Sequence, residues 1–145
     1  MWINWIATVA GIFAATCGGP EYAACFEQRG VTYLVERDEL KTLCPTQTDT
    51  QEAADFVLFL TGTEPAIFND YFVLYVDAPH FDVNGVTAIG VVYVEAKRIK
   101  IADARTPSVD HRVAILRHEF LHVALAVTTG DADYYHEDSR WSLVN

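Results

Sequence analysis

Residues 113–127 read VAILRHEFLHVALAV, and this stretch sets the architecture expected for the chain. Apolar residues stand on both sides of its central polar side chains and leave no continuous polar face, which is typical of a buried helix. Ser108 or Asp110 can cap the start of this helix, and Gly130 suits the position just after its last turn. We therefore predict a long buried helix that ends near residue 129.

Strands and one shorter helix are expected before the long helix. β-branched and aromatic residues predict strands over 31–35, 71–77, 86–94 and 98–102. A helix is expected over about 49–61, where Gly62 ends it. The short link after 86–94 predicts a hairpin, and Gly90 predicts the close approach of another backbone. Strands followed by one dominant helix indicate an α+β domain with a mixed or antiparallel sheet on that helix.

Length and composition limit the class of protein. The chain has 145 residues, of which 51% are hydrophobic and 21% charged, as suits one globular domain with one core. Twenty acidic and ten basic residues give a formal net charge of −10, which repels phosphate. We therefore expect a single domain over 21–145 and no nucleic-acid partner.

Residues 1–20 carry no charged side chain and contain an apolar run from Ile6 to Ala15. Such a run is typical of an export signal, and the small residues before Cys17 are similar to a lipoprotein cleavage site. An export signal, a lipid anchor at Cys17 and a buried N-terminal helix or strand all stay open. The first two predict an exported protein, and the anchor predicts membrane association through this segment.

The other two cysteines bear on the compartment. A disulfide between Cys25 and Cys44 would close a loop of about 20 residues and stabilise the fold by about 3 kcal/mol. Such a bond is typical of an oxidising compartment, and free buried thiols are the alternative. Neither cysteine lies in a C-x-x-C pattern, so no cysteine metal site is expected.

The long helix carries the pattern H-E-x-x-H in residues 118–122. Four residues advance a helix by about 6 Å and about 40°, so His118 and His122 share one face. Each imidazole could place a nitrogen about 2.0–2.1 Å from one zinc ion, while Glu119 reaches a metal-bound water without becoming a ligand. The alternative is a pair of core histidines bridged by Glu119 or by backbone carbonyls, although burial of these groups is costly without a partner.

A catalytic zinc usually takes three protein ligands and one water, so a third ligand is expected after His122. The helix carries the chain about 10 Å beyond His122, and the residues from Gly130 to His136 can span at most about 20 Å. A return to the metal is feasible, and we predict His136 as the third ligand because imidazole is usual there. Asp131 and Asp133 are alternatives, as ligands or as acceptors that orient a ligand imidazole.

Other polar residues have less specific roles. Tyr134 or Tyr135 could donate a hydrogen bond to the oxyanion of a tetrahedral intermediate, although tyrosines near a chain end more often serve packing. Arg117 is expected to pair with an acidic neighbour and Trp141 to pack against the long helix. His111 lies about 10 Å before the motif along the helix and is expected at the surface.

The stretch His118-Glu119-Phe120-Leu121-His122 resembles the active helix of the zincin metallopeptidases. The resemblance implies a small zincin-like domain that hydrolyses peptide bonds, with His118 and His122 as zinc ligands and Glu119 as general base. It also implies that a strand edge pairs with extended substrate, for which Val91–Val94 and Ile99–Ala102 are the candidates. A zinc amidase acting on a cell-wall peptide, and a non-catalytic zinc-stabilised binding domain that would tolerate Glu119→Gln, are alternatives.

The region after the motif is also informative. It is similar to the tail of small bacterial zincin-like proteins at Gly130, Asp131, His136 and Trp141. The longer metzincin pattern is absent, because Leu125 stands in place of its glycine and Thr128 in place of its third histidine. The resemblance is therefore to zincins in general.

Overall fold

The structure is a computed structural model that describes residues 22–102 and 109–144. Its centre is a five-stranded sheet in the order β1 (Ala23–Gln28), β2 (Val31–Val35), β3 (Phe72–Val76), β7 (Arg98–Ala102) and β6 (Gly90–Tyr93). The inner pairs β2–β3 and β3–β7 are parallel, while the outer pairs β1–β2 and β6–β7 are antiparallel. The sheet is therefore mixed, and the α+β prediction is confirmed.

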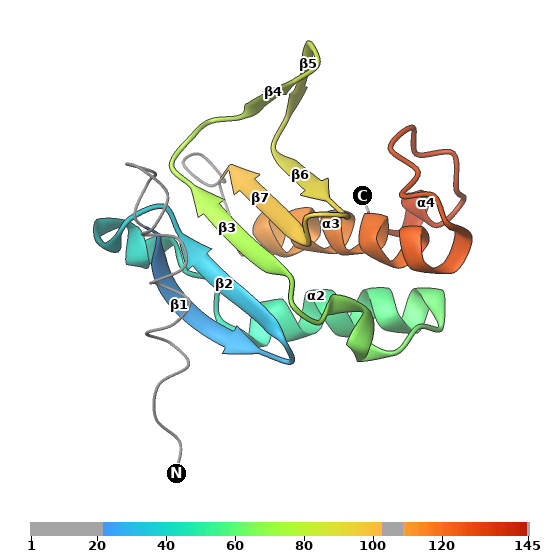
Figure 1. Cartoon of the computed structure of the whole chain (residues 1–145), viewed down its shortest axis with the longest axis horizontal. Coiled ribbons are helices and arrows are strands. Elements are labelled where there is room, and N and C mark those ends of the chain that lie inside the picture. Colours follow the sequence, from blue (N-terminus) through green and yellow to red (C-terminus); the bar gives the residue numbers. More distant parts are fainter. Residues whose placement is uncertain (1–21, 103–108, 145) are drawn as a thin grey trace.

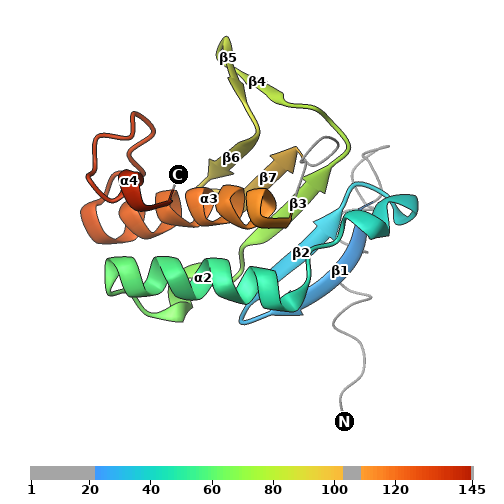
Figure 2. The same ribbon diagram turned by 180° about the vertical axis from the view of Figure 1, so that it is seen from behind.

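Two helices, α2 (Gln47–Thr61) and α3 (Val109–Thr129), lie side by side on one face of this sheet (Figures 1 and 2). The C-terminal residues fold over the end of α3 and finish in the one-turn helix α4 (Trp141–Val144). Two short 3₁₀ helices, η1 (Asp38–Leu43) and η2 (Pro65–Phe68), connect the earlier elements. None of the helices in the described part of the chain is long and apolar enough to cross a membrane.

A second, two-stranded sheet projects from the main one (Figure 1). It is the antiparallel hairpin of β4 (Phe81–Val83) and β5 (Val86–Ala88). Asn84 and Gly85 form its turn with φ angles of 53° and 81°, the left-handed values that a tight two-residue hairpin turn requires.

The strand predicted over 86–94 is wrong as a single element. Residues 86–88 pair with β4, whereas residues 90–93 pair with β7 in the main sheet. Both halves are apolar, so their composition does not reveal the change of partner. The strands predicted over 31–35 and 98–102 are confirmed, and the one predicted over 71–77 is a residue shorter at each end.

Local signals place the ends of both helices. The Thr46 hydroxyl accepts a hydrogen bond from the Asp49 N–H at 3.1 Å, so α2 begins two residues before its predicted start. Gly62 ends α2 as predicted, and its N–H donates to the Leu58 carbonyl. Gly130, with a φ of 79°, closes α3 after Thr129 in the same way.

The core lies between the sheet and the inner face of α3. Phe120 and Leu121 of α3 are fully buried against strand residues such as Ile99 and Ile101. Each side chain of this size contributes about 1.5–3 kcal/mol when it leaves water. The motif residues therefore project from a helix that packing holds firmly in place.

A disulfide joins Cys25 of β1 to Cys44, which follows η1. Of the two alternatives considered for these cysteines, the structure shows the pair and not the free thiols. The predictions about residues 1–20, including Cys17, lie outside the described residues.

Candidate metal centre

Three imidazoles converge beside the middle of α3. His118 and His122 project from consecutive turns of the helix, and the loop after Gly130 brings His136 back to them. One nitrogen from each ring lies within 4.8 Å of the other two, and Nε2 of His122 is 3.4 Å from Nε2 of His136. In residues 22–102 and 109–144, this is the one cluster of at least three histidine, cysteine or acidic side chains that could hold a metal ion.

The tautomer of His122 suits metal binding. Its Nδ1 lies 2.7 Å from the carbonyl oxygen of Ala132, which can only accept a hydrogen bond. Nδ1 therefore carries the hydrogen, and Nε2 keeps a lone pair on the side of His136. Burial lowers the pKa of His122 to about 4, so the ring is neutral at physiological pH. A neutral imidazole oriented through its other nitrogen is the usual form of a metal ligand.

Asp133 organises the loop that carries His136. Its carboxylate accepts hydrogen bonds from the backbone N–H groups of Glu137 at 3.0 Å and Asp138 at 2.7 Å, and from the indole Nε1 of Trp141 at 2.7 Å. These bonds, with that from Glu137 the strongest influence, lower the pKa of Asp133. Asp133 and His136 themselves have left-handed φ angles of 53° and 57°, so the loop holds its turn through two positions that cost energy for these residues.

Trp141 connects this loop to all three histidines. Its ring centroid lies 4.7 Å from that of His118, 4.5 Å from that of His122 and 4.4 Å from that of His136. The prediction that Trp141 packs on the long helix is confirmed, but the contact is with the imidazoles themselves. Asp133 thus acts on the cluster through Trp141, and the structure brings His136, not Asp131 or Asp133, to the pair on α3.

Glu119 is 4% exposed and its carboxyl group lies against β6. A Cβ atom added to Gly90 would stand 2.2 Å from Oε1 of Glu119, so only glycine leaves room there. The predicted close approach at Gly90 is therefore real, but a side chain makes it and not a backbone. Burial raises the pKa of Glu119 to about 8.

The two candidate tyrosines have different surroundings. The Tyr134 hydroxyl donates to the carbonyl oxygen of Val92 in β6 at 3.2 Å, and its ring centroid is 5.2 Å from that of His122. Tyr134 is 55% exposed, whereas Tyr135 is 91% exposed. Tyr134 therefore borders the cluster, and its hydroxyl already has an acceptor.

The remaining predictions on α3 concern its other face. Arg117 pairs with Glu52 of α2, and its guanidinium lies 4.6 Å above the centre of the Phe56 ring. The predicted acidic partner of Arg117 is confirmed. His111 is exposed, as expected.

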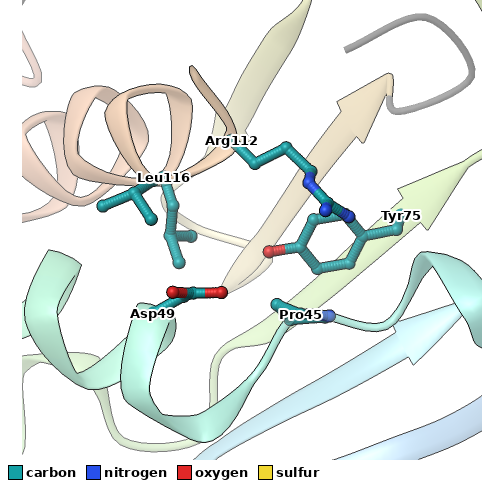
Figure 3. A pocket seen from close by; sticks show the side chains of 6 residues that line it. Pro45, Asp49, Tyr75, Arg112 and Leu116 are labelled. Atoms are coloured by element: carbon teal, nitrogen blue, oxygen red, sulfur yellow. The ribbon is translucent and has the colours of Figure 1, made fainter. Parts of the chain in front are cut away.

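A small hollow lies where α2 and α3 begin (Figure 3). Its volume is about 10 Å³, room for about one water molecule. Figure 3 shows Arg112 beside the Tyr75 ring, with Asp49 and Pro45 on the opposite wall. This hollow is too small for a substrate.

Sequence reasoning missed two features of the cluster, namely the Ala132 carbonyl that orients His122 and the Gly90 surface that receives Glu119. A backbone carbonyl has no sequence signature, whereas the glycine inside a strand was a usable signal. Comparison of the chain with protein-family models, with curated proteins and with solved structures found no match. The assignment of function therefore depends on the site itself.

Proposed function

We propose that this chain is a zinc metallopeptidase with a zincin-like site, in which His118, His122 and His136 hold the metal. The observation that supports this most directly is the convergence of three imidazole nitrogens within 4.8 Å of one another, two from α3 and one from the loop that follows it. Three imidazoles suit a tetrahedral zinc ion with one position left for water. A zinc ion bound there would lower the pKa of that water to about 7 and polarise the scissile carbonyl.

Glu119 is the general base of this proposal. Glu119 follows His118 on the same helix, and its carboxyl group occupies the space that a side chain at Gly90 would fill. A base in this place takes the proton of the attacking water and later delivers it to the leaving amine. A zinc ion bound by the three histidines would favour the ionised form of the buried Glu119 carboxyl group, because it brings positive charge close to it. The ionised form is the one that a base needs.

The peptide would pair with the free edge of β6. β7 lies between β3 and β6, so Ile99–Ala102 has no open edge and only the candidate strand at Val91–Val94 remains. The Ala102 N–H donates to the Ile89 carbonyl at 2.8 Å, which makes 89 and 102 a hydrogen-bonded pair. In an antiparallel ladder the intervening residues, Gly90 and Val92, then direct their backbone groups away from β7. This edge passes next to both Glu119 and Tyr134.

The first test is zinc content by elemental analysis of the wild type, His122→Ala, His136→Ala and Glu119→Gln. We expect one zinc per chain in the wild type and in Glu119→Gln, and loss of zinc from both histidine variants. With a quenched fluorescent peptide library as substrate, Glu119→Gln should lower the rate by about 10² to 10⁴-fold, the usual contribution of a general base.

Three results would change the proposal. No zinc in folded wild-type protein would leave a histidine cluster without a metal function. Zinc without hydrolysis, together with unchanged stability of Glu119→Gln, would indicate a zinc-stabilised binding domain. Cleavage of cell-wall peptides but not of the general library would favour the zinc amidase.

We also propose that the chain is exported to an oxidising compartment, and the Cys25–Cys44 disulfide supports this proposal.

A further inference from the structure

One hydrogen bond stands between the proposed substrate-binding edge and any peptide that would use it. The Tyr134 hydroxyl donates to the Val92 carbonyl at 3.2 Å. Val92 lies in β6 opposite Ile99, in a pair whose backbone groups do not bond to each other, so its carbonyl faces the free edge. The tyrosine therefore occupies an acceptor that an added strand would need.

We propose that Tyr134 is a displaceable cap on the β6 edge, and that the site selects extended peptides whose backbone N–H replaces the tyrosine hydroxyl at the Val92 carbonyl. This inference rests on the proposed function in that the bound peptide is the substrate. A peptide with proline or an N-methylated residue at this position has no N–H to offer and cannot take over the bond. The Tyr134 cap thus discriminates between peptides by the presence of a backbone N–H and not by their side chains.

The surroundings of Tyr134 allow the exchange. Its side chain is 55% exposed, so it can rotate into solvent without opening the core. Once displaced, the hydroxyl becomes free for another acceptor close to His122, which lies 5.2 Å away between ring centroids. Binding of the peptide and displacement of the Tyr134 hydroxyl from the Val92 carbonyl then occur together.

Tyr71 provides a matched control, because its hydroxyl binds a carbonyl of the hairpin formed by β6 and β7. Its hydroxyl donates to the Val94 carbonyl at 3.4 Å, so Tyr71→Phe also removes a tyrosine-to-carbonyl bond close to β6. Val94 lies beyond the end of β6 and in the turn that leads to β7. Tyr71 is buried, so this bond guards no edge that a peptide could reach.

The experiment measures peptide binding without turnover. The protein is Glu119→Gln, alone or combined with Tyr134→Phe or with Tyr71→Phe. The probe is a fluorescein-labelled peptide of sequence Lys-Thr-Val-Ala-Thr-Lys, whose cationic ends suit an acidic protein, and its affinity is measured by fluorescence anisotropy. A series of the same peptide carries a methyl group on one backbone nitrogen at a time.

We expect Tyr134→Phe to bind the unmethylated peptide about twofold to tenfold more tightly, the change that one hydrogen bond produces. Tyr71→Phe should leave the affinity unchanged. The gain from Tyr134→Phe should disappear for one member of the methylated series, the one that lacks the N–H opposite Val92. Where hydrolysis is observed with Glu119 in place, Tyr134→Phe should lower KM by the same factor.

Equal or weaker binding by Tyr134→Phe would overturn the proposal, and so would an equal gain from Tyr71→Phe. Absence of binding to every variant would also overturn it, because a freed carbonyl would then attract no peptide. These outcomes are separate from the test of the enzyme. Failure to find zinc or hydrolysis removes the proposed function, whereas the affinity difference between the two tyrosine variants requires neither.

Discussion

The main sheet has two edges, β1 and β6, and they differ in what protects them. Along β1 the pairing register with β2 shifts between Ala24 and Phe26, and Cys25 at the irregularity is covalently joined to Cys44. Along β6 the Tyr134 hydroxyl binds the Val92 carbonyl, and the strand contains Gly90. A bulge disfavours strand addition and a disulfide is covalent, whereas one hydrogen bond is readily exchanged.

The location of each edge explains the difference. β6 lies over the Glu119 carboxyl group and beside the histidine cluster, so strand addition there brings a peptide to the proposed chemistry. β1 lies four places away in the strand order, so a strand added there would be remote from Glu119 and would promote aggregation. We therefore expect substitutions at β1 to change stability and substitutions near β6 to change activity.

The largest effect should come from the disulfide at the β1 edge. Replacing both Cys25 and Cys44 with serine should lower the free energy of unfolding by about 3 kcal/mol, measured by urea denaturation. Zinc content should not change, because the crosslink joins β1 to the residue after η1 and makes no part of the histidine cluster. Loss of zinc from the folded double variant would show that the two edges depend on each other.

At the β6 edge, Gly90→Ala should lower kcat about 100-fold, since displacing a catalytic group by about 1 Å has an effect of this size. The new Cβ would stand 2.2 Å from Oε1 of Glu119 and must push the carboxyl group aside. Zinc content should be retained. Adding Glu119→Asp, which shortens the side chain, should recover part of the lost activity in the double variant relative to Gly90→Ala.

The matched control is Ala24→Ser, which enlarges a small exposed residue on β1. It should leave kcat, KM and zinc content unchanged. If Gly90→Ala were as active as the wild type, the carboxyl group of Glu119 would not need its present position. Equal losses from both variants would mean that the edges are not functionally distinct.

A smaller effect is expected from the loop that faces the β6 edge. Asp133→Asn should weaken zinc binding about 10- to 100-fold, as is usual when a group that orients metal ligands is altered. The reason is that Asp133 holds Trp141 against the three imidazoles. Competition with a chelating dye measures the affinity, and Glu137→Gln is the control, because its side chain is exposed. Equal affinities for zinc in the two variants would contradict this role.

The smallest effect concerns acid. The Arg140 side chain, more than the other neighbours, lowers the pKa of Asp138 from 3.8 to about 2, and hydrogen bonds lower that of Asp133 as well. A depressed carboxyl pKa stabilises the folded state above the unfolded pKa, and this contribution is lost as the pH falls. The loop should therefore loosen between about pH 4 and pH 2.

Indole fluorescence during acid titration checks this last prediction. A transition in that pH range should be present in the wild type and absent from Trp141→Phe, since Trp141 donates to Asp133. Asp138→Asn should narrow the transition. The two edges would then also differ in their sensitivity to acid, because the disulfide at β1 does not titrate whereas the carboxyl groups of the loop near β6 do. A transition that persists in Trp141→Phe would assign it to another part of the molecule.

The sequence by itself determined the features that depend on neighbouring residues. Helical periodicity places His118, Glu119 and His122 together whatever surrounds them, and Gly130 ends the helix through its own backbone freedom. The few residues after Gly130 can span only a limited distance, which restricted the possible third ligands to side chains in this loop. His136, one of these side chains, lies beside the other two histidines. Such features follow from bond geometry over a few residues.

Only the tertiary structure decided which distant segments meet. The strand over 86–94 divides at Ile89 because its halves find different partners, and β1 was missed because alanine, glutamate and glutamine give a weak strand signal. The contact of Gly90 with Glu119 joins residues that are close only after folding. The bond from Tyr134 to Val92 has the same origin. Pairing across the fold depends on packing of the whole core, which no local pattern specifies.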